Sequence, residues 1–318
     1  MRITYGPWGE TLDELVAAAR AAEDAGAQAI WAPELHRSST VTAAAVAAGT
    51  RSARIGTAIT LAFVRSPMVT ALEALDLDEL SGGRFVLGLG AGVKRLNQDW
   101  HNARWGHPVA HLRESVAAVR HIVAHAADGE PMVLAGEYEP LAVHGFRRPH
   151  PQPRREIPVY LAGMGPAMTR LAGEIGDGWI SHELCSEPWL RECAMPALGE
   201  GLRNAGRDRA SLDVVVSAVC SVDPDPAAAR RRVSGVIEFY ASVRTYADFF
   251  AFHELSDDRD RAIDALTLAG PPGHVRERLA AYDGIADTVK LTPPTHGLTA
   301  AETRAAQKRL IELIRELA

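Results

Sequence analysis

The sequence predicts an α/β fold, a (β/α)8 or TIM barrel, and three observations carry this prediction. Apolar strand-like segments alternate with amphipathic helical segments along all 318 residues, and eight such pairs follow one another. Several of the strands, such as 84–90 and 211–222, are apolar on both faces, as buried parallel strands are. The composition is 47% hydrophobic, which suits a chain with a large core. A doubly wound parallel sheet is the alternative fold.

The elements follow in order from local signals in the sequence. The predicted strands are 2–5, 27–34, 53–60, 84–90, 157–163, 177–181, 211–222 and 286–293. The predicted helices are 11–26, an Ala-rich segment ending near Gly49, 66–83, 111–129, 166–176, 188–205, 226–268, 271–282 and 300–317. Thr11 with Glu14 and Thr299 with Glu302 have the spacing of capping boxes, which places two of the helix starts.

One stretch, about residues 130–156, breaks the alternation. It is rich in proline, glycine and arginine and is too long for a simple loop between a helix and a strand. We therefore expect an insertion, with a small hairpin in it, in a single barrel domain that spans residues 1–318.

The run "GGRFVLGLGAGV" (82–93) resembles a nucleotide-binding loop at first sight. The G-x-G-x-x-G pattern fails, because Val93 stands at the third glycine position when the count starts at Gly88. The run is also the fourth strand of the alternation, whereas a Rossmann loop follows the first. It is better interpreted as a barrel strand whose end, at Gly90 and Ala91, lies close to a ligand; the alternative is a tight packing point.

A second glycine-rich segment predicts an anion site. Gly163, Met164 and Gly165 lead from a strand directly into a helix that has Pro166 at its first position. Free N–H groups and the positive end of the helix dipole favour a phosphate there. An ordinary loop without a ligand is the alternative.

Residues at the carboxyl ends of barrel strands are candidates for chemistry. Glu34 and His36 follow the second strand, and a histidine exchanges protons readily near neutral pH. Trp100 and His101 open an irregular aromatic loop after the fourth strand, which either contacts substrate or folds on its own aromatic residues. His182 follows the sixth strand and is a further candidate.

Several classes of function are disfavoured by the sequence. A net charge of −6 gives no excess of positive charge to attract nucleic acid or an anionic membrane. No apolar stretch is long enough to span a bilayer. Three cysteines in no zinc-binding pattern and an N-terminus without an apolar leader indicate a cytoplasmic protein with reduced thiols. The spacing of His101, His107 and His111 lacks accompanying carboxylates, so no metal site is expected.

The motifs together resemble a known family, the bacterial luciferase-like oxidoreductases. Glu34-x-His36, "IGTAIT", "LSGGRFVLGLGAG" and "LAGMGPAMTRLAGEIGDGWISH" occur in the family's order from about Arg2 to His182, and the resemblance weakens beyond. It implies a barrel that holds FMN or the deazaflavin coenzyme F420 at its strand ends. The overall resemblance of the sequence to F420-dependent members, and its Ala- and Arg-rich composition, favour the F420-dependent branch of the family.

The resemblance also implies roles for individual residues. Ala58 and Ile59 match a non-prolyl cis peptide bulge behind the deazaflavin ring, and Gly90 and Ala91 lie along the cofactor. The segment 163–166 holds the phosphate. His36 matches the rim histidine beside the reacting ring, with Glu34 as the acidic residue near it. Val93 stands where related sugar-phosphate dehydrogenases carry a glutamate, which argues against such a substrate.

The implied activity is hydride transfer between C5 of the deazaflavin and a small organic substrate. The substrate is an activated C=C or C=N bond to be reduced, or an alcohol to be oxidised. Two alternatives stay open: an FMN-dependent monooxygenase of the same fold, and a barrel that binds a flavin without catalysis. Members of the family are often homodimers.

Overall fold

The computed structural model describes residues 1–184, 186–255 and 258–318, and residue 245 by its backbone alone. The chain forms two compact units. Unit 1 comprises Met1–Ile30, Ser181–Pro196 and Asp213–Ala318, and unit 2 comprises Trp31–Ile180 and Ala197–Leu212. That the whole chain acts as one domain stays a prediction.

Unit 1 contains a parallel sheet in the order β11-β10-β12-β1-β2. Its strands are β1 (Arg2–Tyr5), β2 (Ala29–Ala32, shared with unit 2), β10 (Asp213–Val222), β11 (Leu268–Gly270) and β12 (Thr288–Thr292). Its helices are α1 (Leu12–Asp24), α6 (Glu187–Trp189), η3 (Leu190–Ala194), α8 (Pro226–Ala241), η5 (Arg244–Tyr246), α9 (Ala247–Phe252), α10 (Arg259–Leu266), α11 (Pro272–Ala280) and α12 (Ala300–Leu317). The hydroxyl of Tyr5 donates to Gln307 of α12 over 2.7 Å, so this helix covers one face of the sheet.

Unit 2 contains parallel strands in the order β3-β5-β8-β9, with β4 paired to β5. The strands are β3 (Arg54–Thr57), β4 (Thr60–Leu61), β5 (Phe85–Gly90), β8 (Val159–Ala162) and β9 (Gly178–Ile180). The helices are α2 (Ser39–Gly49), η1 (Ala62–Val64), α3 (Pro67–Leu80), η2 (Leu96–Trp100), α4 (Pro108–His125), α5 (Pro166–Ile175), α7 (Met195–Asn204) and η4 (Arg209–Ser211). All of β5 is buried, as its apolar sequence predicted.

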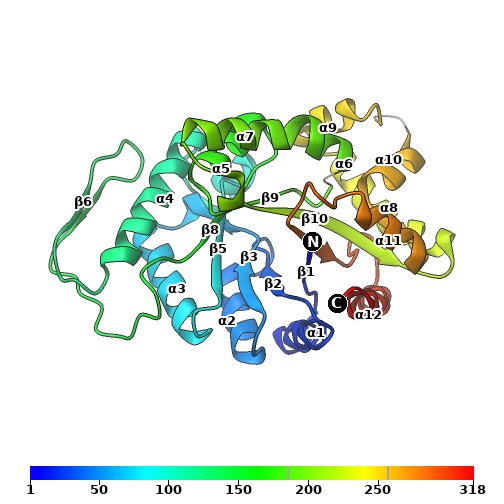
Figure 1. Cartoon of the computed structure of the whole chain (residues 1–318), viewed down its shortest axis with the longest axis horizontal. Coiled ribbons are helices and arrows are strands. Elements are labelled where there is room, and N and C mark those ends of the chain that lie inside the picture. Colours follow the sequence, from blue (N-terminus) through cyan, green and yellow to red (C-terminus); the bar gives the residue numbers. More distant parts are fainter. Residues whose placement is uncertain (185, 256–257) are drawn as a thin grey trace. The chain divides into compact units, whose positions relative to one another are not determined.

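The predicted insertion does contain a hairpin. Strands β6 (Met132–Leu134) and β7 (Leu141–Val143) pair antiparallel, in the long loop beside α4 (Figure 1). The hairpin tip is fastened to α4, because the Glu114 carboxylate accepts hydrogen bonds from the backbone N–H groups of residues 137, 138 and 139. The insertion is therefore an anchored element.

All eight predicted strands are confirmed, but three local predictions need correction. The predicted helix 226–268 is wrong: α8 ends at Ala241, and three short helices follow before the unforeseen strand β11. A three-residue strand is too short for periodicity to reveal. The predicted strand 53–60 is interrupted between β3 and β4. The Thr299–Glu302 capping box is complete, whereas the Glu14 carboxylate accepts from the N–H of Glu10 instead of closing the box on Thr11.

Two further observations concern the chain as a whole. Among the described residues, no helix has both the length and the apolar character needed to cross a bilayer. Cys193 and Cys220 are free thiols, and Cys185 lies outside the described residues.

Candidate functional site

The loop after β2 is fixed to the region of β4 by Glu34. The carboxylate of Glu34 accepts hydrogen bonds from the Leu61 N–H over 2.8 Å and from the Arg65 guanidinium over 2.7 and 2.5 Å. Its side chain is only 7% exposed. A bidentate pair with arginine is a strong and directional contact, so it fixes the loop rigidly to the strand that follows.

The charge of this pair is stabilised inside the protein. Burial raises the pKa of the Glu34 carboxyl, but the hydrogen bonds and charge of Arg65, together with the Leu61 N–H, outweigh it and hold the pKa below its ordinary value. Glu73 lies on the other side of Arg65, at 3.3 Å, and burial raises its pKa. Glu34 thus stays a carboxylate with its oxygens already occupied. Arg65 was not foreseen, because it lies 31 residues away in the sequence.

His36 differs from Glu34, two residues before it. Its side chain is exposed, and within residues 1–184, 186–255 and 258–318 no hydrogen bond or ion pair to it is seen. The imidazole is therefore available to a ligand.

The break between β3 and β4 contains the predicted cis peptide bond. The bond between Ala58 and Ile59 is cis, as the family resemblance implied. The Ala58 N–H donates to the carbonyl of Ala32 over 2.9 Å, and the hydroxyls of Thr60 and Ser39 are 2.8 Å apart. Hydrogen bonds on both sides thus hold the bulge in place.

The glycines of β5 are explained by its neighbouring strands. A Cβ at Gly90 would lie 3.0 Å from the side chain of Ile59 and 3.4 Å from that of Ala162. A Cβ at Gly88 would lie 1.8 Å from the carbonyl oxygen of Thr57, which no adjustment of a side chain could relieve. The predicted residues Ile59 and Gly90 are therefore in direct contact, and the packing explanation for Gly88 is correct.

Ala91 continues this surface. It is 8% exposed, and its carbonyl accepts from the side-chain amide of Asn97 over 2.7 Å. Asn97 is completely buried, and its side-chain oxygen has no partner among the described residues. Sequence reasoning missed Asn97, which lies in the irregular segment η2.

The loop from Gly163 to Pro166 ends β8 and begins α5. The Gly163 carbonyl accepts from the indole N–H of Trp179 over 3.0 Å, which orients the loop. Gly165 is the N-cap of α5, and no side chain caps this end. A Cβ at Gly165 would meet nothing within 4 Å. The N–H groups at the start of the helix, from Ala167 on because Pro166 has none, are therefore not capped by a side chain.

The aromatic loop after β5 is only partly arranged as predicted. Trp100 is 55% exposed, and His101 is exposed too. His111 is buried on α4 between two rings: Phe63 stacks on it at 3.9 Å and Tyr138 at 5.2 Å. Among the described residues, no group of histidine, cysteine and carboxylate side chains is arranged to hold a metal ion.

His182 lies in unit 1, directly after the boundary with unit 2. Its Nδ1 accepts from the Leu184 N–H over 3.3 Å, and the rings of Tyr240 and Tyr246 lie 4.6 and 4.7 Å away. Burial lowers the pKa of His182 to about 4, with the nearby charge of Lys290 acting in the same direction. At neutral pH the ring is therefore neutral, with its proton on Nε2.

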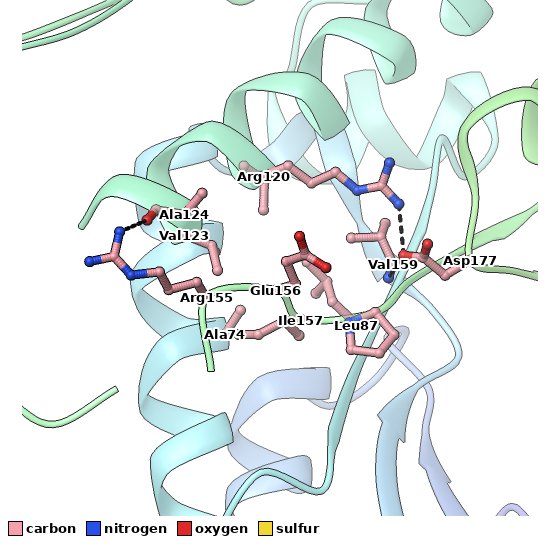
Figure 2. Close-up of a pocket in the computed structure, with 12 residues that line it drawn as sticks. Ala74, Leu87, Arg120, Val123, Ala124, Arg155, Glu156, Ile157, Val159 and Asp177 are labelled. Carbon is pink, nitrogen blue, oxygen red and sulfur yellow. Dashed lines mark hydrogen bonds and ion pairs between the residues drawn. The ribbon is translucent and has the colours of Figure 1, made fainter. Parts of the chain in front are cut away.

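A cavity of about 560 Å³ in unit 2 lies away from all of these residues. It is at the amino end of β8, against α3 and α4 (Figure 2). Arg120 at its edge pairs with Asp177 over 2.7 Å, and Arg155 pairs with Asp128 over 2.8 Å. Barrel enzymes place their chemistry at the carboxyl ends of strands, so this cavity is not the candidate active site.

Comparison with known proteins decides the family. The family model described as luciferase-like monooxygenase matches residues 2–288. The chain belongs to the luciferase-like monooxygenase family. The match reaches well beyond His182, where the resemblance in the motifs weakened. Membership makes the protein an enzyme, an oxidoreductase.

Relatives of this luciferase-like chain include a protein of Mycobacterium tuberculosis described as a putative coenzyme F420-dependent oxidoreductase, which is 28% identical over 90% of this chain and 92% of that protein. An uncharacterised protein of Mycobacterium tuberculosis is 34% identical over 244 residues, which is 76% of this chain and 72% of that protein. A 5,10-methylenetetrahydromethanopterin reductase of Archaeoglobus fulgidus is 30% identical over 288 residues, 81% of this chain and 82% of the reductase.

Solved structures of luciferase-like proteins show the fold. The F420-dependent tetrahydromethanopterin reductase of Methanopyrus kandleri superposes with a TM-score of 0.77 at 21% identity, over 99% of this chain and 98% of that one. The oxygenating constituent of 3,6-diketocamphane monooxygenase from Pseudomonas putida, in complex with FMN, gives 0.77 at 18% identity, over 99% and 97%. These similarities confirm the predicted (β/α)8 barrel. Together with the F420-dependent relative, they support a cofactor of the flavin or deazaflavin class.

Proposed function

We propose that this protein is an F420-dependent oxidoreductase that transfers a hydride between C5 of the deazaflavin and a small organic substrate. The observation that carries the choice of F420 is a relative in Mycobacterium tuberculosis described as a putative coenzyme F420-dependent oxidoreductase, which is 28% identical over 90% of this chain. The substrate is a C=C or C=N bond to be reduced or an alcohol to be oxidised. A homodimer in the cytoplasm is part of the same proposal.

The phosphate of the cofactor would be held at the start of α5. Gly163, Met164, Gly165 and Pro166 form a loop without a capping side chain, and the space at Gly165 is open. No acidic residue occurs in the first turn of α5, so a phosphate would meet N–H donors there and no negative charge that repels it.

The ring system would lie against the bulge and the end of β5. Ile59 and Gly90 are in contact, and Ala58, Ile59 and Ala91 offer small or aliphatic side chains to a flat ring. When bound, the deazaflavin supplies the hydride chemistry; the protein supplies position and exclusion of water. The fit is good here, since all four residues lie in unit 2 on neighbouring strand ends.

Proton transfer to or from the substrate is assigned to His36. Its exposed imidazole has no partner in the described part of the chain, whereas the oxygens of Glu34 are occupied by Arg65 and Leu61. Glu34 is therefore proposed as a positioning residue that holds the His36 loop, and not as the acid that the sequence suggested. Trp100, His101 and the Nε2–H of His182 are proposed substrate contacts.

An FMN-dependent monooxygenase is the second candidate, favoured by the FMN-bound structural neighbour from Pseudomonas putida. The two functions differ in their need for oxygen. We would supply reduced F420 or reduced FMN to the purified protein with a substrate panel, with and without O₂. The proposal expects reoxidation of F420 that depends on substrate and not on O₂. Substrate-dependent O₂ consumption with reduced FMN alone would overturn it.

The third possibility, a barrel that binds a flavin without catalysis, is tested by the same panel. Saturable binding of F420 with no turnover of any ketone, imine, enone or alcohol would favour it. His36→Ala is the matched variant: we expect at least a tenfold loss in kcat with unchanged F420 affinity.

A further inference from the structure

Lysine is rare in this protein, and one of its lysines is in an unusual place. The sequence contains three lysines (Lys94, Lys290 and Lys308) against 31 arginines. Lys94 and Lys308 are exposed, but Lys290 is 7% exposed. Buried cations in proteins are usually arginines paired with carboxylates. In this chain, where almost every cationic side chain is an arginine, one of the few lysines lies in the interior.

Lys290 is on the polar face of the unit 1 sheet. In β12, Val289 and Leu291 share the face of Tyr5, which points to α12, and both are fully buried. Side chains alternate along a strand, so Lys290 and Thr292 lie on the opposite face. The register adds Ser217 of β10 to that face, because it pairs directly with Lys290.

Three polar groups on this face lack partners. No hydrogen bond or ion pair of Lys290 is found within the part of the chain that the structure describes. The hydroxyls of Ser217 and Thr292 are buried and likewise have no partner among the described residues. Ser217 is 1% exposed. Because a buried polar group without a partner costs free energy, two such hydroxyls beside the ammonium of Lys290 point to a ligand.

No charged group among the described residues forms an ion pair with Lys290. The Glu183 carboxylate is close enough to raise the pKa of Lys290, and it accepts a hydrogen bond of 2.8 Å from the hydroxyl of Tyr240. His182 is neutral, as described above. Arg2 and Asp213 pair with each other over 2.7 Å at the far end of the same face. Burial lowers the pKa of Lys290, and Glu183 opposes this.

We propose that Lys290, with the hydroxyls of Ser217 and Thr292, forms a subsite for a carboxylate group of the substrate. The three side chains offer an ammonium and two hydroxyls to oxygen atoms, and charge-assisted hydrogen bonds of this kind are the stronger ones. The residues follow one another toward the carboxyl ends of β10 and β12, where barrel enzymes bind their substrates. That the bound carboxylate belongs to the substrate rests on the proposed function; the anion subsite itself does not.

The small number of lysines makes a direct test practical. Protein grown with lysine labelled with ¹³C at Cε gives three lysine signals in a ¹H–¹³C spectrum, and Lys94→Arg and Lys308→Arg assign them. Sodium acetate is titrated into the full chain, with sodium chloride at equal ionic strength and neutral acetamide as controls. We expect a saturable shift of the Lys290 signal with acetate alone, while the signals of Lys94 and Lys308 respond equally to both salts.

Two variants test which hydroxyls take part. Thr292→Val keeps the Lys290 signal and should weaken acetate binding about tenfold, the usual cost of losing a hydrogen bond to a charged group. Thr42→Val is the matched control, since the hydroxyl of Thr42 in α2 is also buried without a partner in the described structure. It should bind acetate like the wild type.

Two results would overturn the subsite. The first is a Lys290 signal that does not move with acetate, or that moves equally with chloride or acetamide. The second is wild-type acetate affinity in Thr292→Val. No cofactor is present in this experiment, so its failure leaves the F420 proposal standing, and failure of F420 to bind leaves the subsite standing.

Discussion

Two polar clusters at the strand ends, one in each unit, differ in how their groups are satisfied. In unit 2, Glu34 is bound by Arg65 and Leu61, and the hydroxyl of Thr57 both accepts from the N–H and donates to the carbonyl of Gly88. In unit 1, Lys290, Ser217 and Thr292 have no such partners among the described residues. The first arrangement suits a preformed cradle for a rigid cofactor. The second suits a surface completed by a variable substrate.

The largest expected effect comes from breaking a pair in unit 2. Arg65→Met leaves the carboxylate of Glu34 buried and unpaired, and we expect a loss of about 3–5 kcal/mol in the free energy of unfolding. Chemical denaturation at neutral pH measures it. The double variant Glu34→Gln/Arg65→Met should recover part of the loss, because the buried charge is then gone. Equal losses in the single and the double variant would show that the ion pair is not the cause.

In unit 1, removing the charge of Lys290 is expected to raise the free energy of unfolding and not to lower it. Lys290→Met removes a largely buried cation for which the described residues provide no ion pair, so we expect the protein to gain about 1 kcal/mol or more at neutral pH. The pKa of Lys290 is lower in the folded protein than in the unfolded chain, so the lysine becomes less unfavourable as pH rises. The gain should therefore shrink as pH rises toward the ordinary lysine pKa of about 10.4.

The control for this prediction is Lys308→Met on the exposed face of α12, which should change stability by less than about 0.5 kcal/mol at any pH. If Lys290→Met instead loses as much stability near pH 7 as a broken ion pair costs, then Lys290 has a partner. The Glu34 and Lys290 clusters would then not differ in how their charges are satisfied.

A smaller effect is expected where the cradle is tight. In Gly90→Ala the new methyl would lie 3.0 Å from Ile59, so Ile59 must shift by a few tenths of an ångström. We expect a cost of about 1 kcal/mol in stability and a several-fold loss of F420 affinity. Gly106→Ala is the control, because a Cβ there meets nothing within 4 Å. Full cofactor affinity in Gly90→Ala would show that Ile59 does not touch the ring.

Much of the fold could be predicted from the sequence, and less of the site. The alternation of strands and helices gave all eight barrel strands, because periodicity and helix caps are local signals. The strand β11 and the breaks after Ala241 were missed, since three-residue pairing and short helices leave no periodic pattern. The family resemblance supplied the cis bond at Ala58–Ile59, which no local rule would indicate.

The site partners were missed for a related reason. Arg65, Asn97 and Tyr240 act through contacts that form only on folding. A single arginine cannot be singled out in a chain so rich in arginine, and Asn97 and Tyr240 belong to no motif. Lys290 was missed too, although its type is rare in the sequence and the strand 286–293 that contains it was predicted correctly.

The most direct test of the account is an equilibrium titration of F420 followed by its fluorescence. It compares the wild type with Gly165→Asp, which places a carboxylate at the proposed phosphate site, and with Gly273→Asp in the first turn of α11. Both positions are open, and aspartate is favourable at helix starts, so both variants should fold. We predict micromolar binding to the wild type and to Gly273→Asp, and about a hundredfold weaker binding to Gly165→Asp. Wild-type affinity in Gly165→Asp, or binding of FMN in place of F420, would contradict the account.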